Sequence, residues 1–282
     1  MRVGFVGAGQ LGEPMVVRLL AAGHTVHVFA RRQEVASRLH MQGAVVAASL
    51  ADLGRTCDIV ICCMFSDQQL AQVALGPDGI VAHMTPGSTL VSHTTGRVDT
   101  LKRIAGSRPG RDVGIVDAPV SGTAAEIAEG RLTILVGGAA DAVDRVTPIL
   151  GSYAESIMQT GRLGSALNVK LINNLLFAAN LQLAAEAVRL GTVMEIAPDA
   201  LLHALTQCSG SSRAVERALS VGGIEAFGEI AKPFLRKDVA VCLESARAQG
   251  SDLGLLGEVA SGGALDLTPL GGTADTVDSA VP

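Results

Sequence analysis

The sequence feature that most constrains the fold is a glycine-rich turn close to the start of the chain. An apolar segment, residues 2–6, leads directly into GAGQLG at positions 7–12. Helix-forming residues follow to about position 22, and a β-branched segment covers residues 25–29. A strand, a G-x-G-x-x-G turn, a helix and a second strand form the context in which this motif binds a dinucleotide. The sequence therefore predicts a dinucleotide-binding βαβ unit.

The three glycines of this turn have different predicted tasks. Gly7 allows the tight turn, Gly9 lets the backbone approach a pyrophosphate, and Gly12 permits close packing of the helix on the strand. The start of the helix then presents unpaired N–H groups and a positive dipole end to the phosphates. The predicted cofactor-binding residues of the turn are Gly7, Ala8, Gly9, Gln10, Leu11 and Gly12.

The residues that follow the second predicted strand bear on the choice of cofactor. An NAD site usually carries Asp or Glu there, to accept a hydrogen bond from the ribose 2′-hydroxyl. This chain has Arg31 and Arg32 instead, and two guanidinium groups suit a 2′-phosphate. The same pair could be solvated side chains at a helix start, and Glu34 lies close by. We predict NADP as the preferred cofactor, with NAD as the alternative.

Strand and helix patterns continue to alternate up to about residue 160, which predicts an α/β fold with a doubly wound, mostly parallel sheet. Ligands bind at the carboxyl ends of such strands. Met64 and Phe65 follow the predicted strand at 58–63, and Thr95 follows the one at 89–92. These positions therefore fall on the edge of the sheet where a site is expected.

One long helix is predicted from Ser165 to about Gly191, with no proline between them. At ~1.5 Å per residue it would span roughly 40 Å, enough to link two domains. Beyond it the strand patterns disappear, so the second domain should be all-helical. The predicted boundaries are 1–162 for the Rossmann-type domain, 163–260 for the interdomain helix with the all-α domain, and 261–282 for a disordered tail rich in Gly, Ala, Thr, Asp and Ser.

Composition narrows the classes of function. With 48% hydrophobic and 17% charged residues the chain should bury a large core, and a net charge of −5 gives no reason to expect nucleic acid or an anionic membrane surface. The most apolar segments all contain Asn, Lys or Glu, so none is predicted to cross a membrane. No ligand-spaced cluster predicts a metal, and the five cysteines are expected to be free thiols. Without a signal-peptide pattern, a cytoplasmic location is expected.

Lys170 and Asn174 lie four residues apart in the predicted long helix, so they share one face among Leu, Ile and Ala residues. A lysine in such surroundings could simply extend its ammonium to water. It could also lie in a cleft, partly desolvated, and transfer a proton. The pair alone leaves both interpretations open.

A second polar stretch, Ser121-Gly122-Thr123, comes between the predicted strand at 114–116 and a short predicted helix. Its hydroxyl groups and free N–H groups could form an ordinary N-cap. They could equally bind the carboxylate of a substrate. This stretch by itself does not separate the two.

Together these stretches resemble the β-hydroxyacid dehydrogenase family, which includes 3-hydroxyisobutyrate dehydrogenase, tartronate semialdehyde reductase and glyoxylate/succinic semialdehyde reductases. The resemblance covers residues 1 to about 256 and is carried by FVGAGQLGEPM at 5–15, DAPVSG at 117–122, the G-x-x-G-x-x-x-x-x-K-x-x-N-N pattern at 161–174, and Lys237-Asp238.

The resemblance implies an NAD(P)-dependent oxidoreductase that interconverts a small 3-hydroxy acid and its semialdehyde or keto form. It implies that Lys170 is the catalytic acid/base, and that the substrate is a small anionic hydroxy acid or semialdehyde. It also implies a homodimer or homotetramer. The implied substrate-binding residues are Ser121, Gly122, Thr123 and Asn174, and those for the nicotinamide half of the cofactor are Met64, Phe65, Thr95 and Lys237.

The chain departs from the family pattern in several places. Leu11 stands where Met is usual, Thr123 stands where a second glycine is common, and the polar tail replaces the usual C-terminal helix. Two alternatives accompany the main hypothesis: an NADPH-dependent reductase similar to imine reductases, and a non-catalytic nucleotide-binding module. Imine reductases generally carry Asp or Tyr at the position of Lys170, and non-catalytic relatives typically lose this lysine.

Overall fold

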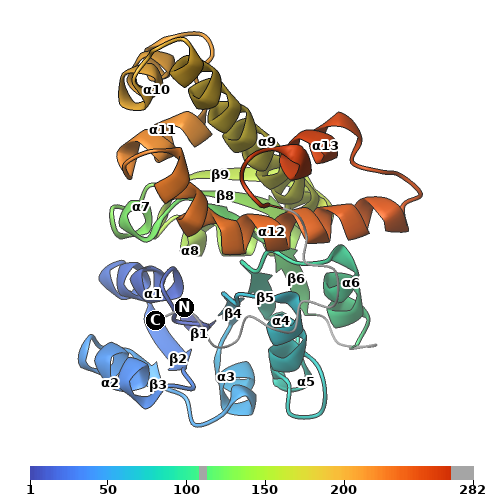
Figure 1. The fold of residues 1–282 in the computed structure, drawn as a ribbon. Helices are drawn as coiled ribbons and strands as arrows, with labels where there is room; N and C mark the ends of the chain where they lie inside the picture. Colours follow the sequence, from blue (N-terminus) through green and yellow to red (C-terminus); the bar gives the residue numbers. More distant parts are fainter. Residues whose placement is uncertain (108–112, 268–282) are drawn as a thin grey trace. The chain divides into compact units, whose positions relative to one another are not determined.

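The computed structural model describes residues 1–107 and 113–267. The chain forms two compact units, Met1–Lys170 and Leu171–Pro282, shown in Figure 1. The division falls inside the long helix, later than the boundary predicted at residue 162. The first turns of this helix therefore belong to the same unit as the sheet.

The first unit contains a nine-stranded sheet in the order β3-β2-β1-β4-β5-β6-β8-β7, with β9 paired to β8. Strands β1 to β6 run parallel, and β8 is antiparallel to both β6 and β7. The order β3-β2-β1-β4-β5-β6 is that of a doubly wound dinucleotide-binding sheet, with its switch point between β1 and β4. The strands are β1 (Arg2–Val6), β2 (Thr25–Phe29), β3 (Val45–Val46), β4 (Ile59–Cys62), β5 (Thr89–Ser92), β6 (Gly114–Asp117), β7 (Val120–Ser121), β8 (Leu132–Gly137) and β9 (Ala154–Gly161).

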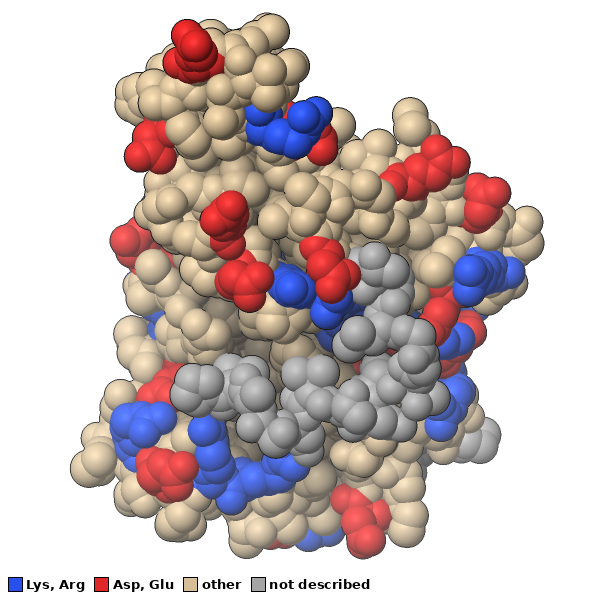
Figure 2. All heavy atoms as spheres, viewed as in Figure 1, with Lys and Arg blue, Asp and Glu red and all other residues tan. Residues whose placement is uncertain are grey.

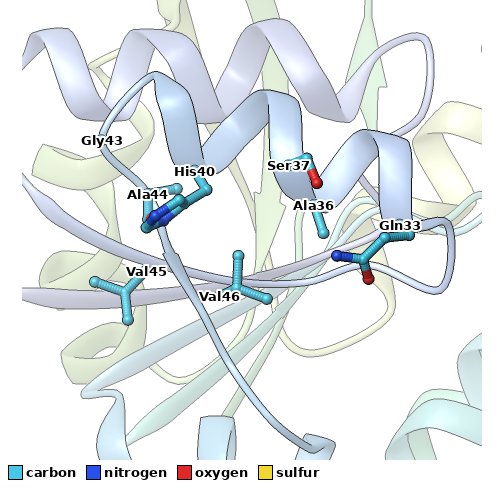
Figure 3. Close-up of a pocket in the computed structure, with 8 residues that line it drawn as sticks. All are labelled: Gln33, Ala36, Ser37, His40, Gly43, Ala44, Val45 and Val46. Carbon is cyan, nitrogen blue, oxygen red and sulfur yellow. The ribbon is translucent and has the colours of Figure 1, made fainter.

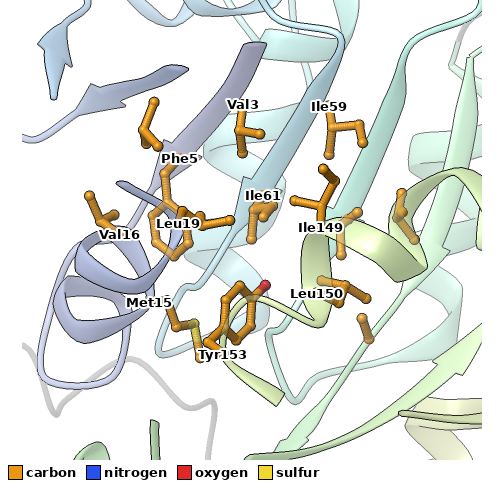
Figure 4. Close-up of a cluster of buried hydrophobic side chains, with 14 of the residues drawn as sticks. Val3, Phe5, Met15, Val16, Leu19, Ile59, Ile61, Ile149, Leu150 and Tyr153 are labelled. Carbon is orange, nitrogen blue, oxygen red and sulfur yellow. The ribbon is translucent and has the colours of Figure 1, made fainter. Parts of the chain in front are cut away.

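Helices cover both faces of this sheet because successive strand residues point to opposite sides. Ile59 and Ile61 of β4 enter one core cluster together with residues of α1, α2 and α8, part of which Figure 4 shows. Val60 and Cys62 enter the other, with residues of α3 to α6. The helices of this unit are α1 (Gly12–Ala21), α2 (Gln33–Met41), α3 (Leu50–Thr56), α4 (Asp67–Ala74), α5 (Ile80–His83), α6 (Val98–Gly106), α7 (Ala124–Ala128) and α8 (Ala140–Leu150).

The second unit is helical throughout its described residues and has a core of its own. Leu171, Leu175 and Ala178 of α9 are buried in it, and Phe177 contacts Phe227 edge to face with ring centroids 6.0 Å apart. The predicted fold class, an N-terminal parallel sheet, a long helix and a helical C-terminal region, is confirmed. The helices are α9 (Ser165–Val193), α10 (Pro198–Gln207), α11 (Arg213–Ser220), α12 (Ile224–Ala248) and α13 (Gly254–Gly262).

Two details of the second unit differ from the sequence-based expectation. Proline usually stands at a helix start or ends a helix, but α12 begins at Ile224 and contains Pro233 in its interior. Residues 261–267 fall within the predicted tail, yet Leu267 is buried, and Gln182 hydrogen-bonds to Ala260 and Leu265. Apolar side chains within a Gly- and Ala-rich segment thus complete the helical core. The rest of the predicted tail, 268–282, lies outside the described residues.

Helix α9 combines buried and exposed apolar residues. It is the one helix in the described part of the chain that is long and apolar enough to cross a membrane, by length and composition alone. Core helices of globular domains pass the same test. Its exposed apolar residues include Ile172, Leu176, Leu183 and Leu190. The expected homodimer or homotetramer stays a prediction.

Candidate active site

The glycine-rich turn has the geometry that a phosphate site needs. Gly7 has a φ of 95°, and a Cβ at this position would overlap the carbonyl oxygen of Cys63. A Cβ on Gly12 would overlap the carbonyl oxygen of Gly7. A Cβ on Gly9, by contrast, would meet no atom within 4 Å. Open space over Gly9 at the start of α1 fits the pyrophosphate of a dinucleotide, because the backbone there can be approached closely.

Hydrogen bonds connect the segments that follow the carboxyl ends of β4 and β5. The backbone N–H of Met64 donates to the hydroxyl of Thr94 at 3.1 Å. One carboxylate oxygen of Asp67 accepts from the backbone N–H of Arg97 at 2.9 Å, and the other accepts from the Thr100 hydroxyl. Met64, Phe65 and Thr95, which are predicted to contact the nicotinamide, therefore lie on two loops whose relative position is fixed by these hydrogen bonds. Asp67, which no sequence motif marks, accepts two of these hydrogen bonds.

Arg31 and Arg32, which are predicted to bind a 2′-phosphate of the cofactor, lie after β2, and both are exposed. Figure 2 shows basic side chains grouped over the part of the first unit that Figure 1 labels α2, β2 and β3. The carboxylate of Glu13, in the first turn of α1, is held by a two-pronged ion pair with Arg38, at 2.6 and 2.7 Å. This pair and the nearby Arg32 lower the pKa of Glu13.

Ser121, Gly122 and Thr123 do not all behave alike. Thr123 is the N-cap of α7 and forms a capping box with Glu126, whose N–H donates to the Thr123 hydroxyl while its carboxylate accepts from the Thr123 N–H. Of the two interpretations, the ordinary N-cap is thus confirmed for Thr123. Ser121 and Gly122 are exposed. A substrate-binding role for the three residues stays a prediction.

A buried pair, His93 and Tyr153, supports the loop that leads to Ser121. Nδ1 of His93 lies 2.5 Å from the carbonyl oxygen of Ala118, and Nε2 lies 2.8 Å from the Tyr153 hydroxyl. Because a carbonyl oxygen only accepts, Nδ1 carries the proton and Nε2 accepts from the tyrosine. Burial lowers the pKa of His93 to about 4, although the bond to Ala118 acts in the opposite direction. The imidazole is therefore neutral at pH 7.

Because the buried His93 is neutral, the free energy of unfolding should fall in acid. Between the unfolded pKa near 6.5 and the folded value of about 4, the unfolded chain binds a proton that the native state excludes. The stabilisation is complete above pH ~6.5 and is lost as the pH falls, by about 2 kcal/mol between pH 7 and pH 5. Urea unfolding of wild type and of His93→Asn at both pH values measures it. Between pH 7 and pH 5 the unfolding free energy of the wild type should fall by about 2 kcal/mol more than that of the variant.

The exposed His203 supplies the matched control. His203→Asn should keep the wild-type difference between pH 7 and pH 5. Equal pH dependence in wild type and His93→Asn would contradict a neutral, buried imidazole at position 93.

The start of α9 is fixed to the sheet within the first unit. Asp117, the last residue of β6, accepts hydrogen bonds from the backbone N–H groups of Gly164 and Leu167 at 2.7 and 2.8 Å. Lys170 lies one helical turn after Leu167 and is half-buried. The predicted acid/base therefore extends from a helix that begins at the carboxyl end of β6, the edge where ligands bind in open sheets.

In the second unit, Asn174 is oriented by a buried carboxylate. Its Nδ2 donates to Oδ2 of Asp238 at 2.5 Å, and its Oδ1 accepts from Nδ2 of Asn173 at 3.0 Å. Since a carboxylate only accepts, the amide orientation of Asn174 is defined. Nζ of Lys237 lies 3.2 Å from Oδ1 of Asp238. The structure thus brings together Asn174 and Lys237 through Asp238, which was noted in the sequence only as part of Lys237-Asp238.

Three other features of the described residues do not form a competing site. An open hollow of about 460 Å³ lies between α2 and the segment 43–46 and is lined by residues such as Gln33, Ser37 and His40 (Figure 3). It lies along the outer edge of the sheet, away from the glycine-rich turn. Burial raises the pKa of the Cys62 and Cys63 thiols to about 12, so neither is a nucleophile. Among the described residues no group of three His, Cys, Asp or Glu side chains could hold a metal.

Comparison with known proteins agrees with this arrangement. Residues 2–161 match the family model described as the NAD binding domain of 6-phosphogluconate dehydrogenase. Residues 164–278 match the one described as NAD-binding of NADP-dependent 3-hydroxyisobutyrate dehydrogenase. The chain belongs to the β-hydroxyacid dehydrogenase family. As a β-hydroxyacid dehydrogenase it is an NAD(P)-dependent oxidoreductase that interconverts a hydroxy acid and its semialdehyde or keto form.

Relatives within the β-hydroxyacid dehydrogenases cover most of the chain. The NAD-dependent L-serine dehydrogenase of Pseudomonas aeruginosa is 30% identical over 258 residues, which cover 89% of this chain and 87% of that protein. L-threonate dehydrogenase of Cupriavidus necator is 34% identical over 211 residues, covering 74% and 71%. The structure of 3-hydroxyisobutyrate dehydrogenase from Mycobacterium tuberculosis with L-serine has a TM-score of 0.82 at 24% identity, covers 95% and 96% of the two chains, and shows the shared fold.

Proposed function

We propose that this β-hydroxyacid dehydrogenase is NADP-preferring, acts on a small anionic 3-hydroxy acid or its semialdehyde, and uses Lys170 as general acid/base. The observation that carries this proposal is the position of Lys170, one turn into a helix whose start is hydrogen-bonded to the last residue of β6. An amine placed at the carboxyl edge of the sheet can exchange a proton with a substrate that binds there.

The chain's own residues have distinct proposed tasks. The turn at Gly9 and the start of α1 would hold the pyrophosphate, and Met64, Phe65, Thr95 and Lys237 would contact the nicotinamide half. A bound nicotinamide supplies the hydride acceptor or donor. In oxidation the Lys170 amine takes the proton of the substrate hydroxyl as the carbinol hydrogen leaves with its electron pair. In reduction the Lys170 ammonium polarises the carbonyl oxygen and then protonates the alkoxide.

The predicted polar contacts and the relatives support the proposed substrate class. L-Serine and L-threonate, named for two relatives, share a carboxylate and a hydroxyl on the β-carbon. Exposed Ser121 and Gly122 offer a hydroxyl and backbone N–H groups for such a carboxylate. The fixed amide of Asn174 offers a second polar contact.

A substrate panel tests this function. Consumption of NADPH and NADH is measured with succinic semialdehyde, glyoxylate and a cyclic imine, and reduction of NADP⁺ and NAD⁺ with L-serine, L-threonate and 3-hydroxyisobutyrate. Turnover of at least one aldehyde or hydroxy acid is expected, faster with the phosphorylated cofactor. Turnover of the imine alone would instead show an imine reductase. Cofactor binding without any turnover would show a non-catalytic module.

Arg31 and Arg32 should determine the cofactor preference. Changing both to Gln is expected to raise the Kd for NADPH by at least about 100-fold, because each charge-assisted contact with a 2′-phosphate contributes on the order of 1.5–3 kcal/mol. The Kd for NADH, which lacks this phosphate, should change by less than about threefold. Fluorescence titration of the purified variants measures both constants.

Arg103, exposed on α6, provides a control of the same chemistry. Arg103→Gln should leave both constants at their wild-type values. If the double Arg31/Arg32 variant loses affinity for NADPH and NADH equally, these arginines do not bind the 2′-phosphate.

A further inference from the structure

Asp117 links the end of the parallel sheet to the start of α9. The residue is only 1% exposed, yet both of its carboxylate oxygens accept hydrogen bonds. Oδ1 accepts from the N–H of Gly164, just before the helix, and Oδ2 accepts from the N–H of Leu167 in its first turn. These belong to the N–H groups that a helix start leaves without intrahelical partners. A side chain distant in the sequence thus caps α9.

The surroundings favour a carboxylate at this position over any other small polar group. An amide would turn its NH₂ toward one of the two N–H donors, and a hydroxyl would reach only one of them. The negative charge also faces the positive end of the dipole of a long helix. Gly137 lies opposite, and a Cβ there would come within 2.7 Å of Oδ1 of Asp117 and 2.8 Å of Oγ of Ser165. A glycine at this point of β8 leaves room for the cap.

We propose that Asp117 is a positioning residue for Lys170, an inference that rests on the proposed acid/base role of this lysine. Leu167, whose N–H is held, and Lys170 are three residues apart, or about 4.5 Å along the helix axis. The same strand end continues through Ala118 and Pro119 to Ser121. One buried side chain therefore fixes the predicted proton donor relative to the predicted substrate-binding turn.

A double-mutant cycle tests whether Asp117 acts through Lys170. Asp117→Asn keeps the size of the side chain and replaces one acceptor with a donor. In the wild-type background it should lower kcat roughly ten- to a hundredfold, because misplacing a catalytic group by about 1 Å has effects of this size. KM for the nicotinamide should change by less than about threefold. In the Lys170→Ala background Asp117→Asn should change kcat by less than about threefold, since the amine is already absent.

A general loss of stability would give a different result. It would lower activity by the same factor with and without Lys170, and that outcome would overturn the proposal. Ser49→Ala serves as a matched control, because the Ser49 hydroxyl accepts from the N–H of Asp52 and caps α3, a helix without proposed site residues. It should leave kcat at the wild-type value. If Asp117→Asn does not fold, Asp117→Ser, which keeps one acceptor, replaces it in the cycle.

Amide hydrogen exchange tests the cap without any substrate. In Asp117→Asn, which keeps one acceptor oxygen, the amide of at least one of Gly164 and Leu167 should exchange at least tenfold faster than in wild type, while that of Asp52 at the start of α3 is unchanged. Unchanged exchange at Gly164 and Leu167 would overturn the cap itself. A wild type that turns over no substrate, with exchange altered as expected, would defeat the proposed function and the positioning role together.

Discussion

Replacing Lys170 with alanine is expected to lower kcat for reduction of a short semialdehyde about a thousandfold. General acid/base catalysis by one positioned side chain contributes typically ~10²–10⁴-fold, and the other proposed site groups stay in place in this variant. The Kd for NADPH should remain within about threefold of wild type, because the phosphate-binding turn at Gly9 is untouched. Stopped-flow measurement of NADPH consumption gives kcat, and fluorescence titration gives the Kd.

Lys102 on α6 supplies the control for this experiment. Its side chain is 68% exposed and its nitrogen lies 3.6 Å from Asp99. Lys102→Ala removes the same chemical group from the surface and should retain full activity. A Lys170→Ala enzyme whose kcat stays within tenfold of wild type would show that another group moves the proton.

Substituting Gly9 and Gly12 should separate cofactor binding from folding. Gly9→Ala meets no atom within 4 Å, so the free energy of unfolding of the cofactor-free protein should change by less than about 0.5 kcal/mol. The Kd for NADPH should nevertheless rise at least tenfold, because the new methyl group occupies space that the pyrophosphate needs. Urea unfolding and NADPH titration of the same preparation measure the two effects.

Gly12→Ala, in contrast to Gly9→Ala, should mainly lower the free energy of unfolding. Its Cβ would overlap the carbonyl oxygen of Gly7 and lie 2.9 Å from the ring of Phe5. The backbone and a buried ring cannot both move aside, so a loss on the order of 3 kcal/mol of unfolding free energy is expected. Intact NADPH binding in Gly9→Ala, or an unchanged stability in Gly12→Ala, would contradict the roles assigned to these glycines.

Local patterns allowed much of the fold to be predicted from the sequence. The glycine-rich turn has sharp steric requirements, and strands and helices differ in hydrophobic period, so the order of elements followed from residue types alone. Pro233 shows where local rules fail, because α12 continues through a proline when packing supports it. Leu265 and Leu267 show the same for the predicted tail, where two apolar side chains outweigh a polar composition.

The residues that support the candidate site could not be predicted in this way. Asp117 hydrogen-bonds to Leu167 across 50 residues, and Asn174 to Asp238 across 64. His93 meets Tyr153 across 60 residues. No spacing in the sequence marks such pairs, because they depend on how strands and helices pack. A buried carboxylate at the end of an apolar strand was the one available signal for Asp117, since a group of this kind requires hydrogen-bond donors.

Chemical rescue of Lys170→Ala is the most direct test of the central claim, that the amine of Lys170 exchanges the proton in hydride transfer. The rate of semialdehyde reduction by NADPH is measured in Lys170→Ala and Lys102→Ala as methylamine is added. We expect a nearly inactive Lys170→Ala enzyme whose rate rises in proportion to methylamine, and a Lys102→Ala enzyme that does not respond. A Lys170→Ala enzyme that works at the wild-type rate without any amine would contradict it.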